Sequence, residues 1–432
     1  MTDILAFESA VGWHALAVDG SRIYDIDRDT FETLLGGEIP SDMAGLVDGT
    51  RGRYVDDRPL SPPAIRALSL NVAQGCNLAC TYCYADEGRF GGRSRLMGQD
   101  VALAAVDRLL AGTRPGEDAV LGFMGGEPLL NRGLIQAVVP EADRRARRRG
   151  VRLRFSLTTN ATLATPADAE LFAAYPFTVT VSLDGNREVN DRQRPGRDRH
   201  GSFERAMAGL ATLASRKPRH LSIRATVTPR MRGLPEILDF LLGLDVDEAG
   251  FAPVLVAPNP ADGFQTDDFA RFLDEMIACG EVAKARLLAG RRYPFSNFET
   301  ALHEIARGTH RPYPCGAGAG YASVSAEGGL FACHRAIDDE RFAIGTVEEG
   351  PDDARRARFL EERHLSRQTP CTTCWARQLC GGGCHQEVLR RGRVGCDYVR
   401  GWLHWCLSAF AEISEQRPDY FRDPNAYFDA AT

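Results

Sequence analysis

Short apolar runs alternate with longer amphipathic segments through the middle of the chain. Six runs rich in β-branched residues predict strands at residues 67–72, 119–124, 153–158, 178–183, 221–227 and 250–256. Apolar residues recur with a helical period between them and predict helices at residues 99–111, 134–149, 203–215 and 236–244. This alternation predicts an α/β fold with a parallel sheet, built as a partial (β/α)6 barrel of the TIM type.

The segments on either side of this barrel have different patterns. Alternating residues 13–18 and 22–26 flank an Asp19-Gly20 turn and predict two strands, followed by a helix that starts near Asp29. Further helices are predicted at residues 267–289 and 297–307, and the tail beyond them is loop-rich, as expected of a domain held by metal clusters rather than by a large core. The predicted domains are a small strand-and-helix module (1–62), the barrel (63–260), a helical linker (261–310) and a cysteine-rich C-terminal domain (311–432).

Charge and hydropathy exclude two classes of partner. The 432 residues carry a formal charge of −6, which argues against a general nucleic-acid surface. The basic run at residues 144–149 continues a polar helix pattern and predicts a solvated face. Because the sequence shows neither a signal-peptide pattern nor a long apolar stretch, we expect a cytoplasmic protein without a membrane partner.

The 12 cysteines need a chemical explanation in that compartment, where disulfides are rare. Three lie between residues 76 and 83, one is at 279, and eight fall between 315 and 406. Cys279 has apolar neighbours in a helix pattern, which favours a small buried side chain. The other cysteines predict two separate metal-binding regions.

Four candidate site motifs follow predicted strands directly. They are the cysteine triplet, Gly125-Gly126-Glu127-Pro128, Thr159-Asn160 and Asp184-Gly185. Because the carboxyl ends of parallel strands share one face of a barrel, these motifs are expected to meet there.

The cysteine triplet has the spacing of a cluster ligand set. Cys76, Cys80 and Cys83 are four and three residues apart, and three thiolates leave one iron of a four-iron cluster open. The alternative is a zinc site, but zinc normally takes four protein ligands in a structural site and no fourth ligand is near in sequence.

This segment resembles the CxxxCxxC signature of the radical S-adenosylmethionine (SAM) superfamily, with Tyr82 as the aromatic residue before the third cysteine. The resemblance implies that SAM chelates the open iron and that its reductive cleavage gives a 5′-deoxyadenosyl radical that abstracts a substrate hydrogen. A flavodoxin- or ferredoxin-type protein is the expected reductant.

The other motifs match SAM-binding positions of the same superfamily. Gly125, Gly126, Glu127 and Pro128 resemble its GGEP motif, in which the glutamate takes the SAM ammonium. Ser182, Asp184 and Arg194 resemble its fourth-strand motif, which implies that Arg194 pairs with the SAM carboxylate. Thr159, Asn160 and Val227 match positions that line the ribose and adenine. For Arg194 the alternative is an ordinary surface arginine.

The tail cysteines resemble the SPASM domain, which carries auxiliary four-iron clusters in peptide-modifying members of the superfamily. The resemblance implies one cluster on Cys371, Cys374, Cys380 and a later cysteine, and a second on Cys315, Cys333 and Cys384. Cys396 is favoured as the last ligand of the first auxiliary cluster, whereas Cys406 either completes the second or is a buried thiol. Three four-iron–four-sulfur clusters and SAM are therefore the expected cofactors.

Residues after Cys333 bear on the reaction. Sulfatase-maturing members have an aspartate base at the position of His334, so that role cannot be carried over. Cys333-His334-Arg335 and the ending at residues 395–402 instead resemble thioether-forming maturases, such as that of quinohemoprotein amine dehydrogenase. We expect an enzyme that installs thioether cross-links in a ribosomally made peptide or small protein, with His334 near the auxiliary cluster.

Three alternatives stay open at this point. The same radical chemistry can oxidise a cysteine or serine, or it can join two carbons. A non-catalytic zinc-bearing peptide-binding protein is the third. The N-terminal module loosely resembles a leader-peptide-binding element that adds a substrate strand to its sheet edge.

Overall fold

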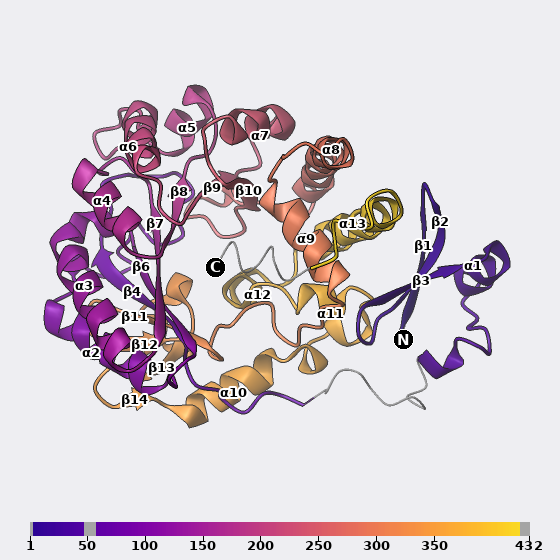
Figure 1. The fold of residues 1–432 in the computed structure, drawn as a ribbon, viewed down its shortest axis with the longest axis horizontal. Helices are drawn as coiled ribbons and strands as arrows, with labels where there is room; N and C mark the ends of the chain where they lie inside the picture. The colour runs from indigo at the N-terminus through magenta and orange to yellow at the C-terminus, as the bar shows by residue number, and fades with distance from the viewer. Residues whose placement is uncertain (1–2, 47–57, 424–432) are drawn as a thin grey trace.

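The computed structural model describes residues 3–46 and 58–423 (Figure 1). Its main sheet contains six neighbouring parallel strands in the order β10-β9-β8-β7-β6-β4. Their bounds are β4 (Ala67–Gln74), β6 (Asp118–Gly125), β7 (Arg152–Thr159), β8 (Phe177–Ser182), β9 (His220–Val227) and β10 (Glu248–Pro253). The predicted α/β partial barrel is confirmed, and each predicted strand is present.

Helices cover the outer face of this sheet (Figure 1). They are α2 (Gln99–Ala111), α3 (Arg132–Arg148), α4 (Pro166–Ala174), α5 (Arg187–Gln193), α6 (Phe203–Ser215) and α7 (Leu234–Leu242). Successive strand residues point to opposite faces, and the outward ones are large and apolar. Phe177 shows this, with its ring centre 5.1 Å from Phe155 and 6.2 Å from Phe123. The main hydrophobic core therefore lies between the sheet and the helices.

The inward face of the barrel is polar. Ser69 is paired with Gly122, and Gly122 with Ser156, so these three residues share the inner face of β4, β6 and β7. Thr180 and Ser222 continue it on β8 and β9, with their hydroxyl oxygens 3.0 Å apart. A closed TIM barrel fills this space with bulky branched side chains. Short polar side chains leave it hollow here.

The C-terminal tail extends the same sheet. Strand β11 (Tyr321–Val324) pairs in parallel with β4, and β12 (Gly329–Phe331), β13 (Ala343–Thr346) and β14 (Gly350–Pro351) follow in antiparallel order. On helix α10 (Asp353–Arg363), Phe359 packs against Phe342 with ring centres 5.7 Å apart. The tail has no separate core among the described residues, because its buried apolar side chains join the main core.

Three long helices and two short ones complete the body. They are α8 (Asp268–Leu288), α9 (Ser296–Ala306), α11 (Arg377–Cys380), α12 (His385–Arg391) and α13 (Cys396–Gln416). Helix α13 packs along α8 and α9, and Lys284 of α8 lies 2.9 Å from Glu412 of α13. The predicted linker helices are therefore part of a packed layer beside β10 (Figure 1).

The N-terminal module is a three-stranded antiparallel sheet with one helix. Its elements are β1 (Ile4–Ser9), β2 (Gly12–Ala17), β3 (Arg22–Ile26) and α1 (Arg28–Leu35). Strand β1 was not predicted from the sequence. It lies against α13, where Ser408 Oγ donates a 2.8 Å hydrogen bond to the carbonyl of Glu8. The boundary predicted between the module and the barrel, at residues 62 and 63, follows a stretch rich in Gly, Asp and Pro at residues 45–63, most of which lies outside the described residues.

The remaining elements are short. They are β5 (Arg95–Leu96) and the 3-10 turns η1 (Ala44–Leu46), η2 (Pro128–Asn131), η3 (Pro260–Asp262), η4 (His334–Ala336), η5 (Glu340–Phe342), η6 (Leu365–Arg367) and η7 (Cys371–Thr373). None of the helices in the described residues is long and apolar enough to cross a bilayer.

Candidate active site

The cysteine triplet lies in the loop after β4, at the carboxyl end of the barrel. Backbone hydrogen bonds from Ala79 to Pro195 (2.8 Å) and from Thr81 to Gln193 (3.0 Å) attach this loop to the segment after β8. Cys76, Cys80 and Cys83 are half-buried and line a cavity of about 1010 Å³. The loop thus presents three sulfurs to one space.

Burial dominates the acid–base properties of two of these thiols. It raises the pKa of Cys76 to about 12 and that of Cys80 to about 11, with Glu127 adding to the first and Arg194 opposing the second. Thiolate ligands must be deprotonated to bind a metal, so loading the site releases protons.

The three sulfurs face the cavity from one loop. Within residues 3–46 and 58–423, no group of three His, Cys, Asp or Glu side chains is placed to hold a single metal ion. Three thiolates are the donors that a four-iron cluster with one open iron takes.

Gly125 and Gly126 form the cavity wall beside the triplet. Gly125 has φ +153°, and a Cβ on either glycine would collide with backbone, that of Ala73 for Gly125 and that of Gly75 for Gly126. The sequence uses glycine here because the turn after β6 touches the chain just before Cys76. Pro128 begins η2 and is buried behind this wall.

Glu127 fastens the same turn to the end of β7. Its carboxylate is fully buried and accepts hydrogen bonds from Thr159 Oγ1 (2.7 Å) and from the backbone N–H groups of Asn160 (2.8 Å) and Leu129 (3.0 Å). Burial raises its pKa, and these hydrogen bonds oppose the rise. Glu127 is not among the residues that line the cavity, whereas its partners Thr159 and Asn160 are. The positioning contacts of Glu127 were not predicted from the sequence.

Tyr82, Asp184 and Arg194 form a buried cluster at the opposite wall. Tyr82 Oη donates a 2.8 Å hydrogen bond to Asp184 Oδ2, and Arg194 Nη1 lies 3.7 Å from Asp184 Oδ1 and contacts Tyr82 Oη. Asp184 also accepts from the backbone N–H of Thr226 at 3.0 Å. Tyr82 and Arg194 line the cavity, whereas Asp184 lies behind them. Arg194 is only 8% exposed, so it is not the ordinary surface arginine that the sequence left open.

Some of the remaining predicted SAM-binding residues point into the cavity, and one does not line it. Thr159, Asn160 and Ser182 line the cavity, and Asn160 Nδ2 lies 3.8 Å from Cys76 Sγ. Val227 is 2% exposed and is not among the cavity residues, because side chains alternate along β9 and Thr226 takes the inward position. The expectation for Val227 is therefore corrected. Met124, Thr226, Val254 and Val256 also line the cavity and were missed.

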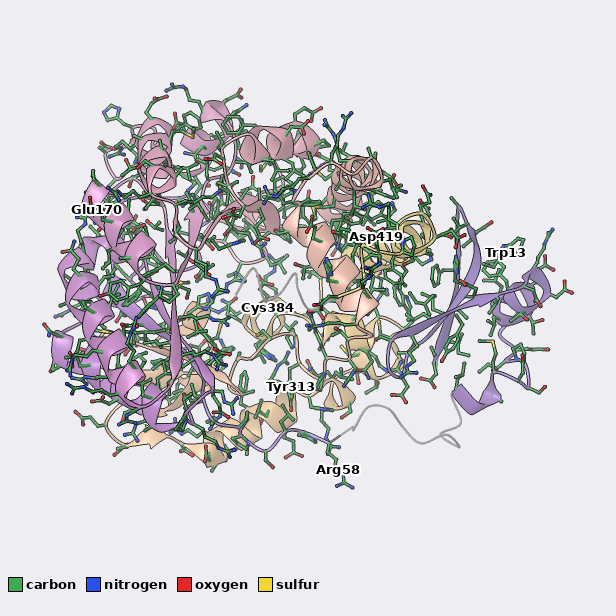
Figure 2. All side chains as sticks on the ribbon, viewed as in Figure 1. Trp13, Arg58, Glu170, Tyr313, Cys384 and Asp419 are labelled. Carbon is green, nitrogen blue, oxygen red and sulfur yellow. The ribbon has the colours of Figure 1, made fainter. Side chains whose placement is uncertain are left out.

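Three tail cysteines gather at the far side of the same cavity. Cys315 and Cys333 line it directly. Burial, and then the neighbouring Cys384 and Cys315, raise the pKa of Cys333 to about 12. Figure 2 labels Cys384 near the middle of the molecule, where the tail faces the barrel. The structure therefore brings Cys315, Cys333 and Cys384 together across 69 residues of tail.

A second tail group surrounds a cavity of about 200 Å³. Its walls contain all five of the cysteines Cys371, Cys374, Cys380, Cys384 and Cys396. Burial raises the pKa of Cys371, and the neighbouring thiolates of Cys380, Cys396 and Cys374 add to it.

Cys406 lies apart from both groups. It is completely buried on α13, ten residues after Cys396, which is about 15 Å along a helix. Burial raises its pKa well above the ordinary value, and no other cysteine contributes. The expectation that Cys406 is a metal ligand is corrected, because helix α13 carries it into the core. Cys279 is fully buried on α8, as its apolar neighbours predicted.

His334 lines the large cavity beside Cys333. Its Nδ1 lies 2.9 Å from Tyr321 Oη, which donates a 2.9 Å hydrogen bond to Ser69 Oγ. Burial, and then the charge of Arg335, lower the pKa of His334 to about 4. At neutral pH the imidazole is therefore uncharged.

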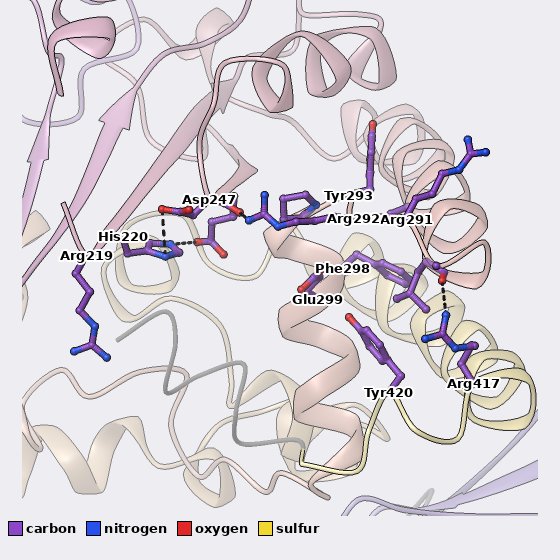
Figure 3. A pocket seen from close by; sticks show the side chains of 15 residues that line it. Arg219, His220, Asp247, Arg291, Arg292, Tyr293, Phe298, Glu299, Arg417 and Tyr420 are labelled. Carbon is purple, nitrogen blue, oxygen red and sulfur yellow. Dashed lines mark hydrogen bonds and ion pairs between the residues drawn. The ribbon is translucent and has the colours of Figure 1, made fainter. Parts of the chain in front are cut away.

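A separate pocket of about 540 Å³ lies at the opposite end of β9 and β10 (Figure 3). His220 stands there with ring nitrogens 4.0 Å from Asp247 and 3.6 Å from Glu248. Glu248 also lines the large cavity, so the two spaces meet at this residue. Functional groups of such barrels collect at the carboxyl ends of strands, which makes the large cavity the candidate active site.

Known proteins are similar to this chain over most of its length. Residues 70–241 match the family model of the radical SAM superfamily. A serine-type anaerobic sulfatase-maturating enzyme of Klebsiella aerogenes is 26% identical over 357 residues, which cover 79% of this chain and 85% of that protein. A cysteine-type anaerobic sulfatase-maturating enzyme of Clostridium novyi is 24% identical over 351 residues, covering 75% and 89%.

Two solved structures share the fold. Histidine-tagged anSMEcpe with bound AdoMet superimposes with a TM-score of 0.72 at 20% identity, covering 84% of this chain and 98% of that one. Streptococcus suis SuiB bound to its precursor peptide SuiA gives a TM-score of 0.52 at 14% identity, covering 91% and 97%. Both alignments cover much more of this chain than the barrel, so the shared fold extends beyond it.

Proposed function

This chain belongs to the radical SAM superfamily, and from that premise we propose that it is a maturase of a ribosomally made peptide or small protein. The observation that carries the proposal is the cavity of about 1010 Å³ that Cys76, Cys80 and Cys83 share with Cys315 and Cys333. A substrate in this space touches both sets of sulfurs. The similarity to sulfatase-maturating enzymes and to a protein bound to its precursor peptide supports a polypeptide substrate.

The residues at the strand ends take the roles that the superfamily motifs imply. Cys76, Cys80 and Cys83 would hold a four-iron cluster with one open iron, and SAM bound there would supply the radical that removes a substrate hydrogen. Arg194, held in place by Tyr82 and Asp184, would pair with the SAM carboxylate. Glu127 would take the SAM ammonium, as the superfamily motif implies. Thr159 and Asn160 would contact the ribose, and Ser182 would lie near the SAM carboxylate.

Thioether formation is the reaction we favour. The polar hollow lined by Ser69, Thr180 and Ser222 accommodates a substrate side chain beneath the SAM site. A substrate cysteine would react as its thiolate, after releasing its proton to solvent, and a cluster on Cys315, Cys333 and Cys384 would take the electron left when the carbon–sulfur bond forms. Uncharged His334 would lie beside this cluster. A second auxiliary cluster on Cys371, Cys374, Cys380 and Cys396 would connect it to a flavodoxin- or ferredoxin-type reductant.

Oxidation of a substrate cysteine or serine is the second candidate. It is favoured by the similarity to sulfatase-maturating enzymes of both the serine and the cysteine type. This chain has His334 at the position where sulfatase-maturing members have an aspartate base, so that base role is not carried over in this reaction either.

The N-terminal module would bind the leader of the substrate. In the described residues, β3 stands at the edge of the sheet β1-β2-β3, and its backbone is available to a further strand. This arrangement would fix the leader while the core of the peptide reaches the cavity.

Cofactor content and SAM cleavage test the enzyme class. The protein, reconstituted without oxygen, should contain roughly twelve irons per chain for three clusters and should convert SAM to 5′-deoxyadenosine with a reductant. Iron-replete protein that makes no 5′-deoxyadenosine would contradict the proposal, and zinc alone would favour the non-catalytic alternative.

Product analysis separates the two reactions. A thioether makes the peptide lighter by two hydrogens and protects one cysteine from iodoacetamide. Serine oxidation removes the same two hydrogens but leaves cysteines reactive and creates an aldehyde that couples to a hydrazide. The peptide encoded beside the gene is the substrate to use, and a carbonyl without thiol protection would overturn thioether formation.

A further inference from the structure

One arginine lies between the two sets of cysteines that face the large cavity. Arg335 is in η4, two residues after Cys333, and its side chain is 25% exposed and lines the cavity. Its backbone N–H lies 3.4 Å from Cys333 Sγ, and its Nη1 lies 3.9 Å from Cys384 Sγ. Two of the three sulfurs proposed for an auxiliary cluster therefore have a donor of Arg335 beside them.

Two further contacts fix the guanidinium group. Nη1 forms a 2.6 Å ion pair with Glu387 of α12, a residue that lines both the large cavity and the smaller tail cavity. On the other side, the guanidinium carbon lies 4.6 Å from the ring centre of Tyr84, which follows Cys83 directly. Arg335 thus bridges the loop of the cysteine triplet and the tail.

One donor of this arginine is unused. The Nε of Arg335 is buried and has no hydrogen-bond partner among the residues that the structure describes. An unsatisfied buried donor costs about 1–3 kcal/mol, so such a group normally has an acceptor. An anionic iron–sulfur cluster held by Cys315, Cys333 and Cys384 is an acceptor of the right charge at this place.

We propose that Arg335 raises the reduction potential of the cluster on Cys315, Cys333 and Cys384 and so makes it the electron acceptor of the reaction. The inference rests on the proposed function, which assigns a cluster to these cysteines. When a substrate carbon radical joins a thiolate sulfur, the new bond leaves one surplus electron. The cluster would take up this electron and so be reduced by one electron. Reduction adds a negative charge, and the guanidinium cation stabilises it. Glu387 opposes this effect and keeps the arginine in place.

A redox titration followed by electron paramagnetic resonance tests the proposal without substrate. The full-length reconstituted protein is compared with Arg335→Gln, Arg335→Lys and Glu387→Gln. Arg335→Gln should lower the reduction equilibrium constant at least tenfold, about 59 mV for one electron. Glu387→Gln should raise it, and Arg335→Lys should stay near the wild type. Arg341→Gln is the matched control, because Arg341 pairs with Asp339 at 2.7 Å on the tail surface.

The opposite signs expected for Arg335→Gln and Glu387→Gln distinguish an electrostatic role from a structural one. Loosening the site would move both potentials in the same direction. If Arg335→Gln loses the cluster, the upward shift in Glu387→Gln supports the proposal and an unchanged potential there overturns it.

Failure of this inference is distinct from failure of the proposed function. Suppose that Cys384→Ala changes the cluster signal of the protein, but Arg335→Gln and Glu387→Gln leave the reduction potential unchanged. This result overturns the role of Arg335 alone. If Cys384→Ala leaves the iron content unchanged, no cluster is bound at Cys315, Cys333 and Cys384. This result overturns both the role of Arg335 and the proposed function of this cluster.

Discussion

The backbone N–H of Glu127 donates a 3.0 Å hydrogen bond to the carbonyl of Gly75, the residue immediately before Cys76. The turn after β6 is therefore attached to the start of the cysteine loop. This contact leaves no room for a side chain between them, because a Cβ on Gly126 would overlap the backbone of Gly75 and lie 2.9 Å from Gly88 Cα.

Gly126→Ala should therefore destabilise the protein by about 1–3 kcal/mol and reduce loading of the first cluster. The added methyl group must push the turn away from Gly75 and displace Cys76. Thermal unfolding and iron content check both effects. Gly133→Ala is the matched control, since a Cβ there meets nothing within 4 Å and Gly133 lies in α3. Equal iron content in the two variants would contradict this account.

The sequence predicted the barrel and the meeting of its motifs because both depend on local patterns. Some strands alternate buried apolar residues with polar ones, as in Phe177–Ser182, and each motif lies at the end of a strand or just after it. Parallel strands bring their carboxyl ends to one face, so Cys76, Gly126 and Asn160 meet without further information.

Other features depend on contacts that no local pattern carries. Strand β11 has four residues and pairs with β4, and Ser323 bonds Ser69 across a separation of 254 residues. Val227 failed as a site residue because one residue of difference at a strand end reverses the side-chain direction. Cys406 failed as a metal ligand because its distance from Cys396 depends on α13 being helical from Cys396 onward.

Cys396 and Cys406 should behave oppositely on substitution. Cys396→Ala removes a proposed ligand of the second tail group and should lower the iron content by about four per chain. Cys406→Ala removes a small buried side chain and should lower the melting temperature while leaving iron unchanged. Iron analysis of both variants checks this, and loss of iron in Cys406→Ala alone would reverse the assignment.

Filling the barrel hollow should separate SAM cleavage from substrate modification. Ser222 lines the cavity four residues before Thr226, which is about 13 Å along β9. Ser222→Leu places a bulky side chain beneath the proposed SAM site without touching it. We expect at least a tenfold loss of modified peptide, with 5′-deoxyadenosine formation without peptide retained.

Ser215→Leu on the exposed end of α6 is the control for that substitution and should modify peptide normally. Mass spectrometry of the peptide and chromatography of the nucleoside measure the two outcomes separately. Parallel loss of both products in Ser222→Leu would mean that the hollow does not receive the substrate.

Glu299 should make the stability of the protein depend on pH. It lies in the pocket at the other end of β9 and β10 (Figure 3), where burial and then Glu248 raise its pKa to about 7, while Arg292 lowers it. The folded pKa is above the unfolded value of about 4.3, so the folded state holds this proton more tightly. The stabilisation is complete below about pH 4.3 and is lost as the pH rises to about 7, a change of at most about 4 kcal/mol. Glu299→Gln should therefore raise the melting temperature at pH 8 and leave it nearly unchanged at pH 4.

The control is Glu415→Gln on the exposed face of α13, which should change the melting temperature at neither pH. If Glu299→Gln raises the melting temperature equally at both pH values, the effect is not one of charge.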